Sequence, residues 1–176
     1  MKRSLPLWQL MGFAVTSLLG TLFHFLYEWT NQSTIAALVS GVNESTWEHM
    51  KLLFFPMFFY GVVQSRFFKE RRDFWCVKTL GITTGILLIP VLFYTYNGAF
   101  GKSPDFINIA FFFVAAAVSY LLETRLYKNG SVVCKRPWIL VVLLIVIAAL
   151  FVIFTFLPPK IPLFADPLTG TYGIQR

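Results

Sequence analysis

The chain has 176 residues, the size of one domain, of which 57% are hydrophobic and only 13% charged. This composition excludes an ordinary water-soluble globular protein and indicates an integral membrane protein. The net charge of +7 could point to nucleic acid, but the basic residues lie in short segments between apolar runs, a pattern typical of membrane topology. We therefore predict that the chain contacts membrane lipids and binds no nucleic acid.

Five apolar stretches are long enough to cross a bilayer, which takes about 20 residues. They are Leu5–Trp29, Trp47–Phe68, Phe74–Tyr96, Phe106–Leu126 and Pro137–Leu157. The sequence thus predicts an all-α, polytopic membrane helix bundle with five transmembrane helices over residues 1–157. Residues 158–176 contain several prolines and glycines, and two alternatives stay open for them: a lid folded over the bundle, or a loose terminal tail.

The Lys and Arg residues are unevenly distributed along the chain. Eleven lie at the N-terminus or near the segments that follow the second and fourth stretches, and four lie on the opposite side. Because positively charged segments stay in the cytoplasm, we predict a plasma-membrane protein with its N-terminus inside and its C-terminus outside. Cys76 and Cys134 fall beside the basic segments, so we interpret them as reduced.

The first stretch carries polar and small residues at helical spacing. They are Ser17, Gly20, Thr21, His24 and Glu28. In lipid such a stripe must face other helices. His24 and Glu28 are four residues apart and can meet on one face, either as part of a site or as a local hydrogen-bonded pair.

The second stretch begins with a helix-start signal. Ser45 and Glu48 form a capping-box pattern, with Asn43 as a rival N-cap. Glu48 could therefore serve only as a cap. Lys51 could pair with Glu48 or extend outward to the interface.

Later stretches contain fewer polar residues. Pro56 and Pro90 should kink their helices, and Thr84 precedes Pro90, so we expect a cavity nearby. The fifth stretch has Thr155 as its single polar residue, which predicts a peripheral, lipid-facing helix. Glu123, near the end of the fourth stretch, is interpreted as an ordinary charge at a helix end.

Ionisable residues at membrane depth mark a functional site by default. The predicted ligand-binding residues are Thr21, His24, Glu28, Glu44, Glu48, His49 and Thr84. A divalent metal is one possibility for the otherwise unknown cofactor, and its predicted ligands are His24, Glu28, Glu48 and His49.

Three functions stay open. The first is an outward-facing pocket between the first three helices that binds a small amphiphilic or lipid-like ligand. The second is an intramembrane enzyme, an acid–base isomerase or a metal-assisted hydrolase, in which Glu28 and Glu48 are the catalytic residues and His24 and His49 assist. The third is a structural membrane subunit, whose partner the sequence does not identify.

Two resemblances add to these hypotheses. The segments 22–29, 42–51 and 162–167 resemble a family of small, uncharacterised multi-helix membrane proteins of Gram-positive bacteria, which implies a bacterial plasma membrane and no particular activity. More remotely, the spacing of Glu48 to Pro56 and of Thr84 to Pro90 is similar to the fold shared by sterol isomerases and sigma-2-type receptors. That resemblance implies that Glu28 and Glu48 face a lipid-shaped cavity with His24 beside them.

Overall fold

A computed structural model describes residues 4–130 and 132–174 and contains five long α-helices. They are α1 (Leu5–Trp29), α2 (Thr46–Ser65), α3 (Phe74–Phe100), α4 (Asp105–Asn129) and α5 (Pro137–Phe156). Two short 3-10 helices, η1 (Ala36–Leu38) and η2 (Pro162–Phe164), lie in the linker after α1 and in the tail. The all-α prediction is confirmed, with helix bounds within a few residues of the apolar stretches.

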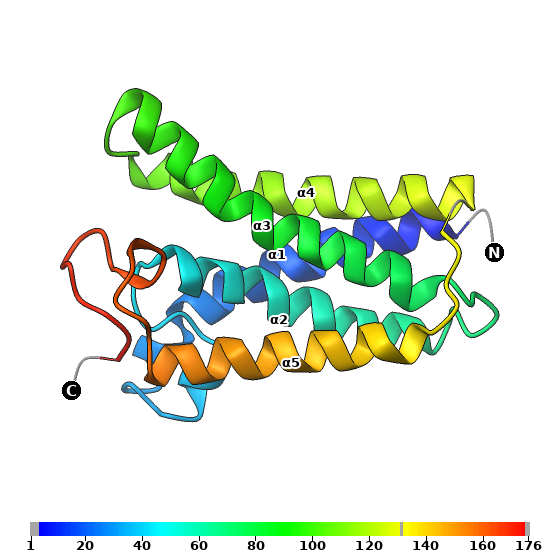
Figure 1. The fold of residues 1–176 in the computed structure, drawn as a ribbon, viewed down its shortest axis with the longest axis horizontal. Helices are drawn as coiled ribbons and strands as arrows, with labels where there is room; N and C mark the ends of the chain where they lie inside the picture. The colour runs from blue at the N-terminus through cyan, green and yellow to red at the C-terminus, as the bar shows by residue number, and fades with distance from the viewer. Residues whose placement is uncertain (1–3, 131, 175–176) are drawn as a thin grey trace.

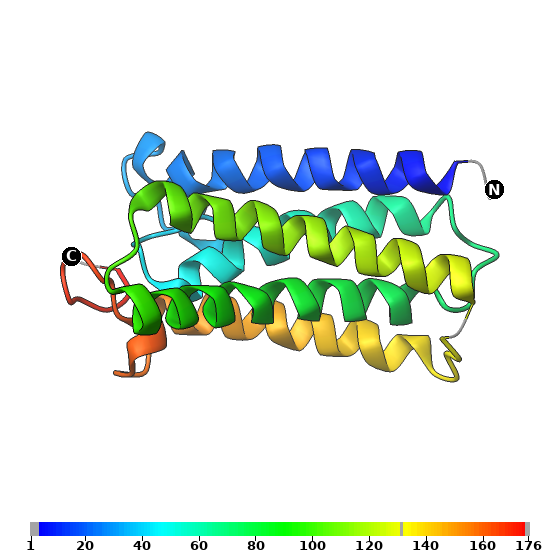
Figure 2. The same cartoon turned by 90° about the horizontal axis from the view of Figure 1, so that it is seen from above.

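The helices run along the long axis of the molecule, and the two chain ends lie at opposite ends of it (Figures 1 and 2). We call the end with the C-terminus the tail end, and the other the N-terminal end. At the tail end the hairpin between α3 and α4 leans away from the other helices in Figure 1. This leaves room for side chains of α2, α4 and the tail to line a common hollow.

The central helix is α2, which contacts each of the other four helices. Its buried side chains include Phe54 and Met57, which belong to the main hydrophobic core. Four polar residues of α2 are buried as well: Thr46, Glu48, Lys51 and Gln64. The other helices enclose α2, so these polar groups are kept away from lipid. In contrast, α5 buries few of its side chains and is peripheral, as the sequence predicts.

Four helices in the described part of the chain are long and apolar enough to cross a membrane, namely α1, α3, α4 and α5. The helix α2 is not among them. Its polar groups lower its hydropathy, and its central place explains how it tolerates them. The orientation across a membrane stays a prediction, and Lys2, Arg3 and Arg176, which enter the charge count, lie outside the described residues.

Two interpretations that concern residues of α3 are wrong. Cys76 and Cys134 form a disulfide with Cα atoms 6.0 Å apart. The antiparallel packing of α3 on α4 brings the start of α3 next to the segment after α4, which a separation of 58 residues in the sequence could not indicate. Lys78 is one of the eleven Lys and Arg residues that the sequence assigned to the cytoplasmic side, but it lies within α3 and is fully buried.

The tail folds back onto the tail end of the bundle. Phe164 of η2 is buried, and its ring lies 4.7 Å from that of Trp47 at the start of α2. The Asn43 side chain donates to the Gly173 carbonyl, and the Glu44 amide donates to Asp166. The tail therefore lies beside the start of α2, where the predicted site residues Glu44, Glu48 and His49 lie.

Candidate functional site

Three of the sequence-predicted residues meet at the tail end: His24, Glu44 and His49. His24 lies near the end of α1, His49 in the first turn of α2, and Glu44 in the linker between these helices. One atom from each side chain lies within 4.8 Å of an atom from each of the others. We call these residues the His–Glu–His cluster.

The linker is tied to α1 beside His24. The Ser40 hydroxyl donates to the Phe23 carbonyl and accepts from the Tyr27 amide, the two groups that bond each other in an unbroken helix. The Gly41 amide also donates to the Phe23 carbonyl. These bonds hold the linker along the last turns of α1, and so bring Glu44 next to His24.

The start of α2 places His49. The Ser45 side chain accepts from the Glu48 amide at 3.4 Å, so Ser45 is the N-cap that the sequence predicts. Asn43 accepts from the Ser45 amide instead of capping the helix. One turn into the helix, Nδ1 of His49 lies 2.9 Å from the Ser45 carbonyl, which can only accept, so Nδ1 carries the proton. In the neutral ring, Nε2 then has a free lone pair.

The Glu44 carboxylate lies between the two imidazoles. Its Oε1 is 3.5 Å from Nε2 of His24, and its Oε2 is 3.5 Å from Nε2 of His49. The ring centroids of the histidines are 5.7 Å apart. All three side chains are half-buried, and both separations are longer than a good hydrogen bond.

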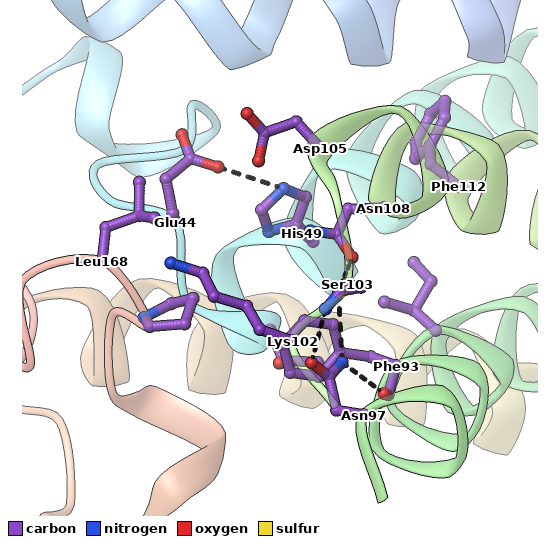
Figure 3. A pocket seen from close by; sticks show the side chains of 13 residues that line it. Glu44, His49, Phe93, Asn97, Lys102, Ser103, Asp105, Asn108, Phe112 and Leu168 are labelled. Carbon is purple, nitrogen blue, oxygen red and sulfur yellow. Dashed lines mark hydrogen bonds and ion pairs between the residues drawn. The ribbon is translucent and has the colours of Figure 1, made fainter. Parts of the chain in front are cut away.

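The cluster borders three hollows, the third of which is polar and lined by His24, Glu28 and Glu44. The first, shown in Figure 3, is lined by Glu44 and His49 together with polar residues of the α3–α4 hairpin, Lys102, Asp105 and Asn108 among them. The tail closes one side of it with Pro167 and Leu168. The second hollow is a groove of about 150 Å³ between α1 and α4, which starts at His24 and His49 and is otherwise mostly apolar.

Glu48 belongs to a different, buried network. It is 2% exposed, and its Oε2 lies 2.5 Å from Nζ of the fully buried Lys51. The Thr155 hydroxyl of α5 donates to the other carboxylate oxygen at 2.8 Å, and Lys51 also donates to the Ala37 carbonyl of η1. The predicted ion pair of Lys51 is confirmed, and the alternative in which Lys51 extends outward is wrong.

The remaining predicted residues lie around the cluster or apart from it. Glu28 is exposed and lines a polar hollow of about 220 Å³ with His24 and Glu44, but no ion pair joins Glu28 to His24 in the part of the chain that the structure describes. Thr21 is exposed and lines the apolar groove. Thr84 is half-buried in α3 and lines none of these three hollows.

Comparison with known proteins adds a family. The model of one protein family matches residues 1–174, almost the full length of the chain. The chain belongs to DUF6512, a family of unknown function. No curated protein and no solved structure matches it. The predicted family of multi-helix proteins with apolar helices is thus confirmed, while the bacterial origin and the sterol-isomerase-like fold stay predictions.

This DUF6512 member has a second buried polar network, which sequence reasoning missed. Lys78 of α3 and Glu123 of α4 are fully buried and pair at 2.7 Å. The interpretation of Glu123 as an ordinary charge at a helix end is therefore wrong. The Lys78 ammonium also lies 5.1 Å from the centre of the Tyr120 ring. The available signal was a charged residue about one turn inside each apolar stretch, Lys78 near the start of the third and Glu123 near the end of the fourth. A Lys and a Glu inside apolar stretches need a partner.

Two glutamine side chains are buried toward the same end of the bundle as this second network. The side-chain nitrogen and oxygen of Gln9 and of Gln64 are buried without a hydrogen-bond partner, as is Oε1 of Glu123. Polar atoms of this kind are satisfied by ordered water in most proteins. The network lies toward the N-terminal end of the bundle, far along the helices from the His–Glu–His cluster.

Proposed function

We propose that this protein is a multi-pass membrane protein that binds a small amphiphile at the tail end of the bundle. The polar head of the ligand would contact His24, Glu44 and His49, and its hydrocarbon part would lie in the groove between α1 and α4. The observation that carries the proposal is that His24 and His49 belong both to the polar cluster and to the wall of an apolar groove.

The walls of the groove suit a hydrocarbon chain. Phe25 of α1 and Ile109, Phe112 and Phe113 of α4 line it. Phe25, Ile109 and Phe113 are also partly exposed on the outside of helices that are apolar enough to face lipid. A ligand dissolved in the bilayer could therefore enter from the side and leave its head at the cluster, where Thr21 and Asn108 add polar groups.

The tail is proposed to act as a lid over the other side of the cluster. Pro167 and Leu168 line the hollow next to Glu44 and His49, and the Glu44 amide bonds Asp166 of the same tail. A head group that contacts Glu44 would therefore also contact residues 166–168. We keep the predicted orientation for this proposal, with the C-terminus and the cluster on the outer side of the plasma membrane.

Binding of dodecanoate to the full chain in mild detergent tests the proposal. Thr21→Phe fills the groove, so we expect it to weaken dodecanoate binding by at least about 10-fold, or about 1.4 kcal/mol. Leu18→Phe is the matched control, because Leu18 is 61% exposed on the same helix and lines no hollow described above. Equal affinities in both variants and the unchanged protein would overturn the proposal.

An intramembrane enzyme is the second candidate, and the His–Glu–His cluster favours its metal-assisted version. Two imidazoles and a carboxylate form a ligand set of catalytic zinc sites. The acid–base version with Glu28 and Glu48 has less support, because Glu48 is buried in an ion pair and Glu28 is exposed away from it. Hydrolysis of a lipid-like ester by the metal-loaded protein would distinguish an enzyme from a binding protein.

A further inference from the structure

The His–Glu–His cluster has the donor atoms of a transition-metal site. Imidazole nitrogen and carboxylate oxygen both bind zinc, at about 2.0–2.2 Å. Ligands at that distance from a tetrahedral ion lie about 3.4 Å from one another. The Glu44 carboxylate already lies 3.5 Å from Nε2 of each histidine, so small side-chain rotations would complete the site.

The surrounding structure prepares these atoms for a cation. Nδ1 of His49 donates to the Ser45 carbonyl, which fixes the ring and turns the Nε2 lone pair toward Glu44. A second hydrogen bond of this type is usual for metal-binding histidines. The ring of His24 packs edge-on against Phe25, with centroids 4.9 Å apart, and its Nε2 also faces Glu44.

The buried lysine next to His49 in the sequence is already engaged elsewhere. Lys51, two residues after His49, is fully buried and pairs with Glu48. Its ammonium also donates to the Ala37 carbonyl and to the Thr155 hydroxyl. Lys51 therefore does not pair with Glu44. A half-buried carboxylate that faces Nε2 of two imidazoles is a site that favours a divalent cation.

We propose that His24, Glu44 and His49 bind one divalent transition-metal ion, for which zinc is the best fit. This set differs from the ligands predicted from the sequence, because Glu44 replaces both Glu28 and Glu48. The assignment of the metal does not depend on the proposed binding of an amphiphile. Three protein ligands leave one position of a tetrahedral ion open, as in catalytic zinc sites.

The open position has a consequence for the ligand, and this step rests on the proposed function. Lys102 lines the hollow beside Glu44 and His49, and its side chain extends into it in Figure 3. A metal ion and an ammonium group together select an anionic head, so the amphiphile is a carboxylate or a phosphate. Neutral amphiphiles of equal chain length would bind more weakly.

The test uses the full chain, produced without a polyhistidine tag, stripped with a chelator and titrated with CoCl₂. We expect one ion per chain and the visible absorption of tetrahedral Co²⁺, which ZnCl₂ abolishes by displacement. Glu44→Gln and His49→Ala should each lower the affinity more than about 100-fold, since even the loss of a side chain that only hydrogen-bonds a metal ligand costs about 10–100-fold. Glu70→Gln, an exposed carboxylate at the other end, is the matched control.

Several outcomes would overturn the metal site. They are absence of stoichiometric binding in the unchanged protein, unchanged affinity in Glu44→Gln, and an equal loss in Glu28→Gln. Because His49→Ala could disturb the start of α2, the unfolding of each metal-free variant is compared with that of the unchanged protein. The isosteric Glu44→Gln carries the test if His49→Ala does not fold.

Amphiphile binding is measured separately, so that the two proposals fail independently. Thr21→Phe should retain Co²⁺ while losing dodecanoate. Metal-loaded protein should prefer dodecanoate over dodecanol by at least about 10-fold, and stripped protein should not. Acetate is the control for a free anion, because it has the carboxylate of dodecanoate but no hydrocarbon chain. An equal preference with and without metal would overturn the anionic head, whereas metal binding without dodecanoate binding would overturn only the proposed function.

Discussion

At the scale of single residues, two buried ion pairs differ in how well their surroundings satisfy them. Glu48 accepts from Lys51, from the Thr155 hydroxyl and from the Val42 amide, so both of its oxygens are bonded. Glu123 bonds Lys78 through Oε2, while its Oε1 is buried without a partner. The first pair therefore joins the linker, α2 and α5 into one unit, which suits a structural role.

Removing one partner of the first pair should be costly. Lys51→Met leaves the Glu48 carboxylate buried without its cation, and we expect a loss of about 3–5 kcal/mol of stability. Glu48→Gln/Lys51→Met removes both charges; the amide oxygen can still accept from Val42, and the amide nitrogen can donate to the Thr155 hydroxyl, which then donates to the Phe151 carbonyl. The two changes should therefore couple favourably by at least about 1 kcal/mol. Unfolding of the single and double variants in a denaturing detergent measures this coupling, and additive losses would contradict it.

The sequence predicted the acidic residues and histidines at the tail end as one group. It did not predict their division into the His–Glu–His cluster and the buried Glu48–Lys51 pair. Glu28, Glu44 and Glu48 all lie near the same end, and helical spacing favours a pair of His24 with Glu28. The bonds of Ser40 to α1 decide otherwise, because they place the linker so that Glu44 reaches both histidines. Such bonds join segments without periodicity, and sequence patterns of helices do not report them.

At the scale of elements, long apolar runs predicted the helices, but the sequence did not predict which helices pack against one another. The start of α2 follows from the Ser45 cap, and the peripheral place of α5 follows from its lack of polar residues. Which helices become neighbours depends on close approach at small residues. One example is Gly81 of α3, where the side chain of Glu123 from α4 occupies the space beside the backbone.

A matched pair of glycines tests this packing. A Cβ on Gly81 would collide with Oε1 and Cγ of Glu123, which is buried and held by Lys78. We expect Gly81→Ala to destabilise the protein by about 1–3 kcal/mol, as overpacking does. Gly98→Ala is the control on the same helix, because nothing lies within 4 Å of its added Cβ.

Stability against denaturing detergent compares the two variants. Gly98→Ala should be neutral or gain up to about 1 kcal/mol, since alanine is the better helix former. A loss in Gly98→Ala as large as that in Gly81→Ala would show that the α3–α4 contact is not what requires the glycine.

At the scale of the whole molecule, charge and disulfide lie at the same end. Arg66, Arg71, Lys128 and Arg136 are near the N-terminal end of the bundle, and the Cys76–Cys134 bond joins α3 to the segment after α4 there. Positive charge favours the cytoplasm for this end, whereas disulfides persist in oxidising compartments. The two tendencies therefore give opposite orientations.

We expect the charge to decide the orientation, because Lys and Arg beside membrane spans act while the helices insert. Full-length chains with green fluorescent protein at either terminus should fluoresce only when the fusion is N-terminal, and alkaline phosphatase should be active only when it is C-terminal. The two termini lie at opposite ends of the bundle, so the reporters serve as controls for each other (Figure 1). The reverse pattern would contradict the charge-based orientation and would put the Cys76–Cys134 bond on the oxidising side. The His–Glu–His cluster, at the opposite end, would then face the cytoplasm and its metal pool.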